Sequence, residues 1–291
     1  MKQIRLTTPV VPDAAPFSIG PTDSCLLMGS CFTENISTRL ETAGFDILTN
    51  PFGISYNPLS MADAVERILD GRGVGETQLV ERDGLWHSWL HHGSFSRHTK
   101  EACLSACNES LSAGHAFLDA CQVVMFTFGS AWHYRLQRDG SVVNNCHKVP
   151  ADAFSCRLAT VDEVVESWLP LLERLHMMGK RVLFTVSPVR HGAYGAHGNQ
   201  LGKAVLLLAV ERLRAALGSS PSWFYYFPAY EIMMDELRDY RFYADDLLHP
   251  SSMAEEIIWQ RFQQVLMTPQ ARDLVACNEK HARQQAHRPL H

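Results

Sequence analysis

Short apolar runs alternate with helical patterns along this chain, and that alternation restricts the possible folds more than any other feature. The clearest candidate for a buried strand is the run 122–128, which reads Gln-Val-Val-Met-Phe-Thr-Phe and ends at Gly129. Four further candidates lie at 24–28, 45–48, 181–186 and 223–227. Strands that are apolar throughout and alternate with helices are typical of a parallel sheet covered on both faces. We therefore expect an α/β fold.

Helix start signals agree with this expectation. A helix should follow the first strand over 33–42, and Thr160 with Glu163 has the pattern of a capping box for another helix. Pro170 lies inside that second pattern and should kink or divide it. The run 201–217 is also helical in pattern.

Two Arg-Asp-Gly turns, at 82–84 and 138–140, indicate β-hairpins inserted between the core elements. Residues 20–266 contain no low-complexity linker, internal repeat or step in composition, so we expect them to form a single domain. Residues 1–19 are then an N-terminal extension. Residues 267–291, rich in Arg, His and Gln, are a C-terminal surface helix or tail.

Composition excludes several classes of protein. The 291 residues are 46% hydrophobic and 20% charged, which is enough apolar content for a sizeable core. The 26 basic and 31 acidic residues give a net charge of −5, which argues against nucleic acid as a partner. No apolar run is long enough to cross a membrane. The N-terminal residues are followed by prolines rather than by an apolar signal core, so we expect a cytoplasmic protein.

The eight cysteines are scattered and include no CxxC pair, which disfavours a zinc ribbon. A chain of this size does not need a disulfide scaffold. We therefore expect reduced thiols, most of them buried as small apolar side chains. The question is whether one of them takes part in chemistry.

One cysteine lies where a strand runs directly into a helix. The first apolar strand is followed by Gly29-Ser30-Cys31-Phe32-Thr33, and ligands of open α/β sheets collect at the carboxyl ends of strands. Free N–H groups at a helix start stabilise negative charge, lower the pKa of a thiol and can hold an oxyanion. The alternative interpretation is a small-residue turn in which Ser30 is only a helix cap.

A second polar group precedes the last main helix. Asp246 and His249 are three residues apart, so a single turn can bring the carboxylate beside the imidazole. Together with Cys31 or Ser30 they form the set of nucleophile, base and orienting group that covalent catalysis requires. Alternatively, His249 is a helix-start residue with a local Asp cap.

At this point the chain resembles the GSCFA family. Gly29–Thr33 matches its signature, with Thr33 in place of the final Ala. The resemblance continues in consistent order through Asn50–Gly53, Gly129–Trp132, Asn145–Pro150, Ser187–His191, Tyr226–Glu231, Asp235–Tyr240 and Asp246–Pro250. This family in turn resembles the SGNH (GDSL-type) hydrolases. The resemblance implies a flavodoxin-like three-layer sandwich with about five parallel strands, and hydrolysis or transfer of acyl groups.

The resemblance also implies roles for individual residues. The first SGNH block reads Gly-Asp-Ser-x-Thr-Glu, and it aligns without gaps with Gly29–Glu34. This alignment implies that Cys31 occupies the nucleophile position. Ser30 then occupies the position of the Asp, where it would cap the turn. We favour Cys31 and keep Ser30 as the alternative. The last block matches with His249 as general base and Asp246 as its partner.

The resemblance is weaker for the oxyanion hole. Gly53 is the counterpart of the second-block glycine, whose N–H serves the oxyanion. The third block, Gly-x-Asn-Asp, meets Gly129–Trp132, so its Asn donor is missing. Ser130, Asn145 and His147 are candidates to replace it.

Other side chains carry weaker expectations. Arg190 and His191 end the fourth strand and could bind an acidic substrate group or position the loop. The histidines at 87, 91, 92 and 147 could line a pocket or bind a metal, but they lack an acidic or Cys ligand at a familiar spacing, which favours a hairpin with surface imidazoles.

We therefore expect an acyl hydrolase or acyltransferase that forms a covalent acyl-enzyme on Cys31 or Ser30, without cofactor or metal. Its substrate would be an ester or thioester, on a small molecule or linked to carbohydrate, and an acyl-thioester donor is one candidate. Two alternatives remain, an inactive SGNH fold that binds an acylated or carbohydrate ligand, and a metal-dependent hydrolase.

Overall fold

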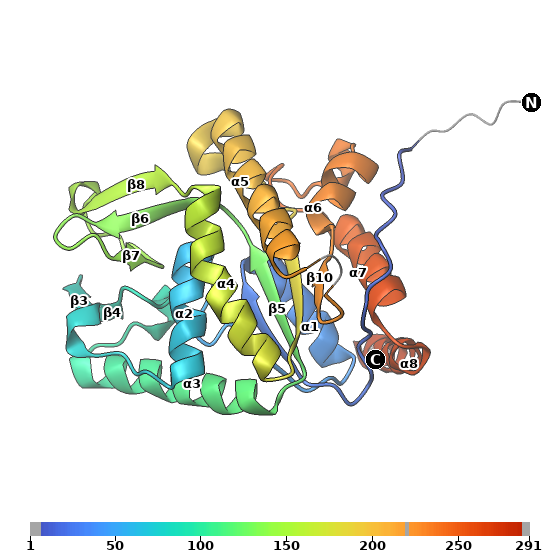
Figure 1. Ribbon diagram of the computed structural model, residues 1–291, viewed down its shortest axis with the longest axis horizontal. Coiled ribbons are helices and arrows are strands. Elements are labelled where there is room, and N and C mark those ends of the chain that lie inside the picture. Colours follow the sequence, from blue (N-terminus) through green and yellow to red (C-terminus); the bar gives the residue numbers. More distant parts are fainter. Residues whose placement is uncertain (1–6, 219–220, 287–291) are drawn as a thin grey trace, which may run out of the picture.

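Five parallel strands form the central sheet of the computed structural model, which describes residues 7–218 and 221–286 (Figure 1). They are β1 (Cys25–Gly29), β2 (Ile47–Thr49), β5 (Val123–Phe128), β9 (Arg181–Val186) and β10 (Phe224–Tyr226). Their order across the sheet is β10-β9-β5-β1-β2. Numbered among themselves, they follow the order 2-1-3-4-5 that defines flavodoxin-like sheets. The predicted α/β fold is confirmed.

The register of the sheet brings its polar turns to one edge. Gly29 of β1 pairs with Thr127 of β5, and Phe128 of β5 pairs with Val186 of β9. The residues that follow these strands therefore leave the sheet at the same level. This carboxyl edge is where an open α/β sheet presents its site.

Helices cover both faces of the sheet, and the two faces have separate cores. On one face lie α2 (Pro58–Asp70), α3 (Lys100–Ala120), α4 (Val161–Met177) and α5 (Gly195–Ala216). On the other lie α1 (Cys31–Thr42), the short α6 (Ala229–Glu231), α7 (Ser252–Leu266) and α8 (Pro269–Ala286). Successive residues of β1 alternate between the two cores, since Leu26 packs in the first and Leu27 in the second.

Local signals set several boundaries. Thr160 and Glu163 form the predicted capping box at the start of α4. The helix continues through Pro170, so the predicted division is wrong; the buried side chains of Trp168 and Leu172 hold both halves on the sheet. Helix α1 begins two residues before the predicted start at Thr33.

The two Arg-Asp-Gly turns are hairpin tips, as predicted. Strands β3 (Leu79–Arg82) and β4 (Leu85–Ser88) form a two-stranded sheet. Strands β6 (Trp132–Leu136), β7 (Val142–Val143) and β8 (Phe154–Leu158) form a three-stranded sheet. Both insertions extend from the same end of the molecule, away from α7 and α8 (Figure 1).

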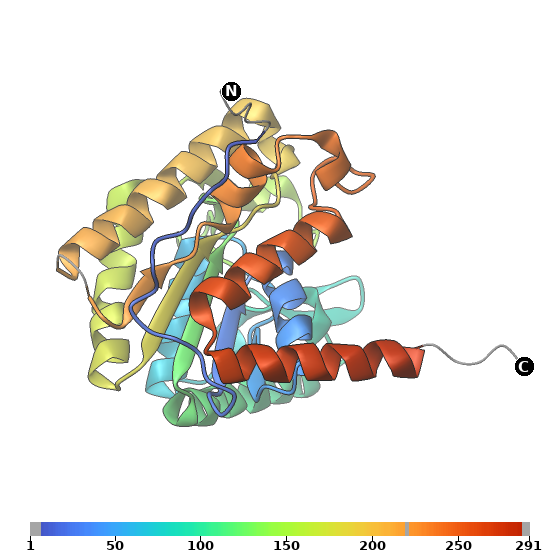
Figure 2. The same cartoon turned by 90° about the vertical axis from the view of Figure 1, so that its right-hand side faces the viewer.

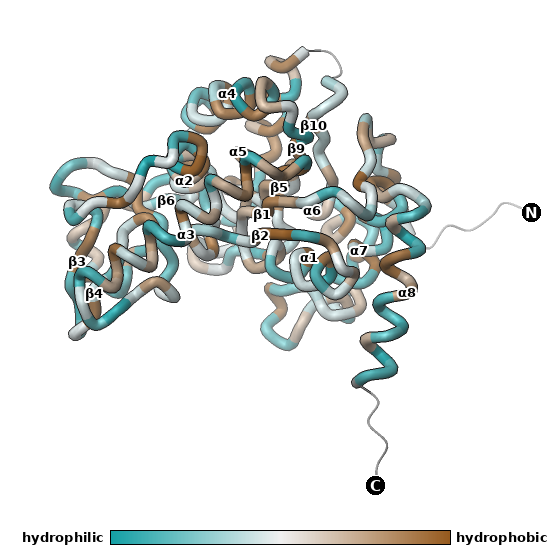
Figure 3. Tube along the Cα trace, turned by 90° about the horizontal axis from the view of Figure 1, so that it is seen from below, coloured by the Kyte–Doolittle hydropathy of each residue, from teal (hydrophilic) through white to brown (hydrophobic). Residues whose placement is uncertain are grey.

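Two segments that are far apart in sequence, around Ile19 and Leu266, pair at the opposite side of the molecule. Ile19 is fully buried and pairs with the start of the C-terminal segment, since its N–H donates to the Leu266 carbonyl at 2.6 Å. Helix α8 runs along the edge of the molecule and is mostly hydrophilic (Figures 2 and 3). The predicted extension 1–19 and tail 267–291 fall partly outside the described residues. No helix within the described ranges has the length and apolarity to cross a membrane.

Candidate active site

The turn from β1 into α1 places Cys31 at the first position of a helix. Ser30 is the N-cap residue, with extended backbone, and its carbonyl accepts the N–H of Thr33 at 2.8 Å. The first N–H groups of an α-helix have no partner within the helix. The N–H groups of Cys31 and Phe32 are two of these, and they act to lower the pKa of the Cys31 thiol. Cys31 therefore stands at a helix start directly after β1.

Ser30 differs from Cys31 in accessibility. The Ser30 side chain is only 1% exposed, and its hydroxyl has no hydrogen-bond partner in the described part of the chain. It makes no capping hydrogen bond, so the prediction that its side chain caps the turn is wrong. The hydroxyl points into the protein because β1 is buried up to its last residue. Cys31 is half-buried and reaches the surface.

A cleft of about 500 Å³ joins Cys31 to His249. Helix α1 supplies one wall, with Glu34 and Arg39, and the segment before α7 supplies the other, with His249. Val189, just beyond β9, completes it. Residues from both ends of the chain thus meet at the carboxyl edge of the sheet.

Asp246 orients His249. Its Oδ2 lies 2.5 Å from His249 Nδ1, and its Oδ1 accepts the N–H groups of Leu248 and His249, each at 2.9 Å. These hydrogen bonds lower the pKa of Asp246 to about 2. The carboxylate is therefore ionised at neutral pH and fixes the proton of the neutral imidazole on Nδ1, which leaves Nε2 as the basic nitrogen.

The segment that carries this pair is closed on itself. The Ala244 N–H donates to the His249 carbonyl at 2.8 Å, and Tyr243 pairs with Pro250 as an antiparallel bridge. Leu247, at the tip, has a φ of 58°. We call residues 243–250 the histidine loop.

The expectation that the helix start lowers the pKa of Cys31 is wrong. Burial raises the pKa of Cys31 above its ordinary value, and the carboxylate of Glu34 acts in the same direction. The N–H groups of Phe32 and Cys31 and the ammonium of Lys203 act to lower it but do not prevail. The thiol therefore needs a base to form the thiolate at neutral pH.

Gly53 does not fit the role of oxyanion donor. Its N–H donates to the Asn50 carbonyl at 2.7 Å inside a tight turn. Its φ is +74°, and an added Cβ would lie 2.3 Å from the Cβ of His92, so glycine is needed there for conformation and packing. Asn50 is the residue of this turn that contacts β1, because its Oδ1 accepts the Gly29 N–H at 2.8 Å.

The three candidates to replace the missing Asn are engaged elsewhere. Ser130 is buried; its N–H donates to the Tyr56 carbonyl at 2.9 Å, and its hydroxyl accepts the Trp132 N–H at 3.2 Å. Asn145 accepts the N–H of His147, whose ring Nε2 bonds to the Ser88 carbonyl at 2.7 Å. Asn145 and His147 belong to the hairpin region and do not line the cleft.

Arg190 and His191 follow β9 beside the histidine loop. The Arg190 N–H donates to the Leu248 carbonyl at 3.0 Å, and its Nε to the Tyr243 hydroxyl at 3.3 Å, so Arg190 supports this loop. Its side chain also lines a neighbouring hollow of about 440 Å³ with Leu247. His191 is half-buried, and its pKa is lowered by burial and by Lys203.

Three of the four histidines expected as an alternative metal site, His87, His91 and His147, pack against other rings instead, and His92 caps a short turn by accepting the Ser94 N–H at 3.3 Å. The rings of His87 and His147 stack at 4.6 Å, and His91 stacks on Phe52 at 4.3 Å. Burial lowers the pKa of His91 to about 3 and that of His147 to about 4. Within the described residues no three His, Cys, Asp or Glu side chains gather as a metal site.

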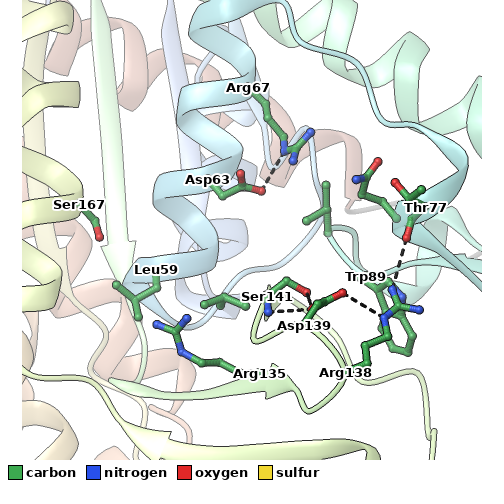
Figure 4. Close-up of a pocket in the computed structure, with 13 residues that line it drawn as sticks. Leu59, Asp63, Arg67, Thr77, Trp89, Arg135, Arg138, Asp139, Ser141 and Ser167 are labelled. Atoms are coloured by element: carbon green, nitrogen blue, oxygen red, sulfur yellow. Dashed lines mark hydrogen bonds and ion pairs between the residues drawn. The ribbon is translucent and has the colours of Figure 1, made fainter.

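A larger cavity, of about 650 Å³, lies between the hairpin insertions and helices α2 and α4 (Figure 4). Two of its arginines already form ion pairs with neighbouring carboxylates. Arg67 contacts Asp63 at 2.9 Å, and Arg138 contacts Asp139 at 3.1 Å (Figure 4). Neither Cys31 nor His249 lines this cavity.

Lys203 is a buried charged residue at the carboxyl edge of the sheet that the sequence motifs do not reveal. It lies on α5, is 2% exposed, and its Nζ donates to the carbonyls of Gly129 at 2.8 Å and Ser187 at 2.7 Å. A signal does exist in the sequence, because Lys203 shares the helical spacing of the core residues Leu206 and Val210. A lysine in such a position requires an explanation.

The sheet order and the cleft define a flavodoxin-like α/β protein with a cysteine, a histidine and an aspartate at its carboxyl edge. Residues 24–262 match the GSCFA family. The chain belongs to the GSCFA family, as the sequence motifs predict. A comparison with curated proteins finds no match.

Among solved structures, the chain is distantly similar to several esterases. A GDSL-like lipase from Bacteroides thetaiotaomicron is 10% identical, with a TM-score of 0.38 and coverage of 91% of this chain and 89% of that one. A psychrotrophic esterase from Pseudoalteromonas is 10% identical, with a TM-score of 0.37 and coverage of 84% and 96%. A carbohydrate esterase family 3 protein from Talaromyces cellulolyticus is 8% identical, with a TM-score of 0.37 and coverage of 89% and 99%.

Proposed function

We propose that this protein is an acyl hydrolase or acyltransferase that acts through a thioester intermediate on Cys31. The observation that carries the proposal is the shared cleft, which both Cys31 and His249 line while Asp246 holds the imidazole. The burial of the Ser30 hydroxyl favours Cys31 as the nucleophile. The raised pKa of Cys31 explains why such a nucleophile would be paired with a base.

The proposed acylation step transfers one proton and exchanges one bond. His249 Nε2 takes the thiol proton as the Cys31 sulfur attacks the acyl carbonyl carbon. The carbonyl oxygen becomes an oxyanion, and the N–H groups of Cys31 and Phe32 are its donors. The intermediate then collapses, the bond to the leaving oxygen or sulfur breaks, and the imidazolium returns the proton to that atom.

In the second step, water or an acceptor hydroxyl attacks the thioester. His249 again removes the proton from the attacking oxygen, and the thiol is restored when the carbon–sulfur bond breaks. The choice of acceptor separates hydrolysis from transfer. The open cleft beside Arg39 and Glu255 leaves room for either.

The test uses a panel of activated acyl esters and thioesters with detection of the adduct by intact-protein and peptide mass spectrometry. We expect one acyl group on Cys31, in wild type and in Ser30→Ala, and none in Cys31→Ala. His249→Ala should slow adduct formation. An adduct confined to Ser30, or turnover that persists in Cys31→Ala, would contradict the proposal. Ligand binding that survives in Cys31→Ala with no adduct in wild type would favour a binding module.

A further inference from the structure

A second charged group of the site is buried beneath the nucleophile edge. The Lys203 ammonium is held between the ends of β5 and β9 by the carbonyls of Gly129 and Ser187. Its Nζ lies 5.4 Å from the centroid of the Tyr230 ring. Because β1 is the neighbour of β5, this ammonium lies at the same edge as Cys31.

Burying a cation is costly unless an opposite charge accompanies it. Burial lowers the pKa of Lys203 to about 7. The thiolate of Cys31, once it forms, acts in the opposite direction and favours the ammonium. The two carbonyls orient the ammonium but supply only partial charges.

Lys203 and Cys31 act on each other in both directions. The ammonium lowers the pKa of Cys31, and the thiolate raises the pKa of Lys203. The other titratable or charged groups that face this pair come from every neighbouring element: Glu34 and Arg39 on α1, Tyr56 before α2, His191 after β9, Tyr230 on α6, His249, and Glu255 on α7. Of these, Glu34 opposes thiolate formation.

We propose that Lys203 is a positioning residue of the site, and that its ammonium is the buried counter-charge of the Cys31 thiolate. This inference rests on the proposed function, because a counter-charge has a purpose only if Cys31 reacts as a thiolate. In the acylation step, the proton that leaves the sulfur goes to His249 and Lys203 keeps its own. The ammonium stabilises the anionic sulfur until the new carbon–sulfur bond removes the charge.

The chain offers a matched control in Lys180. This lysine is 4% exposed and donates to two backbone carbonyls, of Asp119 at 2.9 Å and Cys121 at 2.7 Å. It precedes β9 and so lies at the opposite, amino edge of the sheet. Lys180→Met removes a buried ammonium with the same bonding and leaves the field at Cys31 unchanged.

The experiment measures the rate of Cys31 alkylation by iodoacetamide against pH, with peptide mass spectrometry to separate Cys31 from the other seven thiols. In Lys203→Met and Lys203→Gln, alkylation of Cys31 should slow about tenfold below about pH 7, where wild-type Lys203 is protonated, and the difference from wild type should shrink above that pH as Lys203 loses its proton. Lys180→Met should follow the wild-type profile. Lys203→Gln retains a donor for the carbonyls, so it separates charge from hydrogen bonding.

A wild-type pH profile in folded Lys203→Gln would overturn the inference. If neither Lys203 variant folds, the reciprocal measurement decides, because coupling between two sites is mutual. The titration of the Lys203 side chain, followed by NMR, should lie at higher pH in Cys31→Asp, which carries a negative charge at position 31, than in the uncharged Cys31→Ser, and identical titrations would refute the coupling. Neither measurement needs turnover, so a coupled pair without any acyl adduct would reject the proposed function and leave the coupling intact.

Discussion

Replacing Asp246 by Asn should separate the shape of the histidine loop from the chemistry of His249. The carboxylate accepts three hydrogen bonds, two from backbone N–H groups on Oδ1 and one from the ring on Oδ2. Asn keeps the oxygen for the two backbone donors. Its NH₂ group then faces Nδ1, and this nitrogen must become the acceptor. The proton of the neutral ring moves to Nε2, which can no longer accept the proton of Cys31.

The expected loss follows from the role of the base. General base catalysis contributes about 10²-fold to about 10⁴-fold, and the same Asp-to-Asn exchange in serine proteases costs about 10⁴-fold. A thiol is more acidic than a serine hydroxyl, so we expect a loss near 10²-fold for Asp246→Asn. Asp246→Ala should lose at least as much and also loosen the loop.

The assay is the rate of Cys31 acylation by an activated ester, with circular dichroism as the check on folding. Asp245→Asn is the matched control, because this neighbouring carboxylate is exposed and makes no hydrogen bond within the described residues. It removes the same charge and should acylate at the wild-type rate. A wild-type rate in Asp246→Asn would refute the assignment of His249 as the base oriented by Asp246.

Three further predictions concern the framework of the site. In Gly29→Ala the new Cβ would lie 2.7 Å from the Cβ of Thr127, so the free energy of unfolding, measured by urea denaturation, should fall by about 1–3 kcal/mol. Gly93→Ala is the control, because its Cβ meets no atom within 4 Å, and its stability should stay close to that of wild type. Trp168→Ala empties a fully buried site beneath the sheet and should cost about 3–5 kcal/mol in the same assay; a loss below about 1 kcal/mol would contradict its place in the core. His91 is fully buried, and its pKa is lowered to about 3. Between about pH 6.5 and about pH 3, therefore, this histidine is protonated in the unfolded chain but neutral in the folded chain. The free energy of unfolding should fall by up to about 1.4 kcal/mol for each pH unit across this range. His91→Phe should make that part of the stability curve less steep, and the slope that remains comes in part from His147, whose pKa is also lowered. An unchanged slope would show that His91 is not a source of it.

The sequence predicts the sheet and the pair of polar segments well because both depend on local patterns. The strand Val123–Phe128 is apolar without interruption, and the capping box at Thr160 uses residues three apart. Asp246 and His249 are equally close in sequence, so their hydrogen bond needs no knowledge of the rest of the fold. The family motifs add the meeting of this pair with Cys31.

The remaining errors concern contacts between distant segments. Ser30 has the composition of a cap, but the burial of β1 turns its hydroxyl inward. Gly53 occupies the expected place in the chain, while its N–H is taken by Asn50. Lys203 becomes part of the site only because three strands end at one level beneath it, which no local pattern contains.

The closure of the histidine loop on itself makes the site an assembly of two parts that can be altered independently. The base and its carboxylate are fixed by bonds within 243–250, while the sulfur is fixed by the junction of β1 with α1. A sequence change at position 31 therefore leaves the acid–base pair in place. Under the proposed function, such an architecture would let a sulfur and an oxygen nucleophile replace one another at position 31 while Asp246 and His249 stay in place.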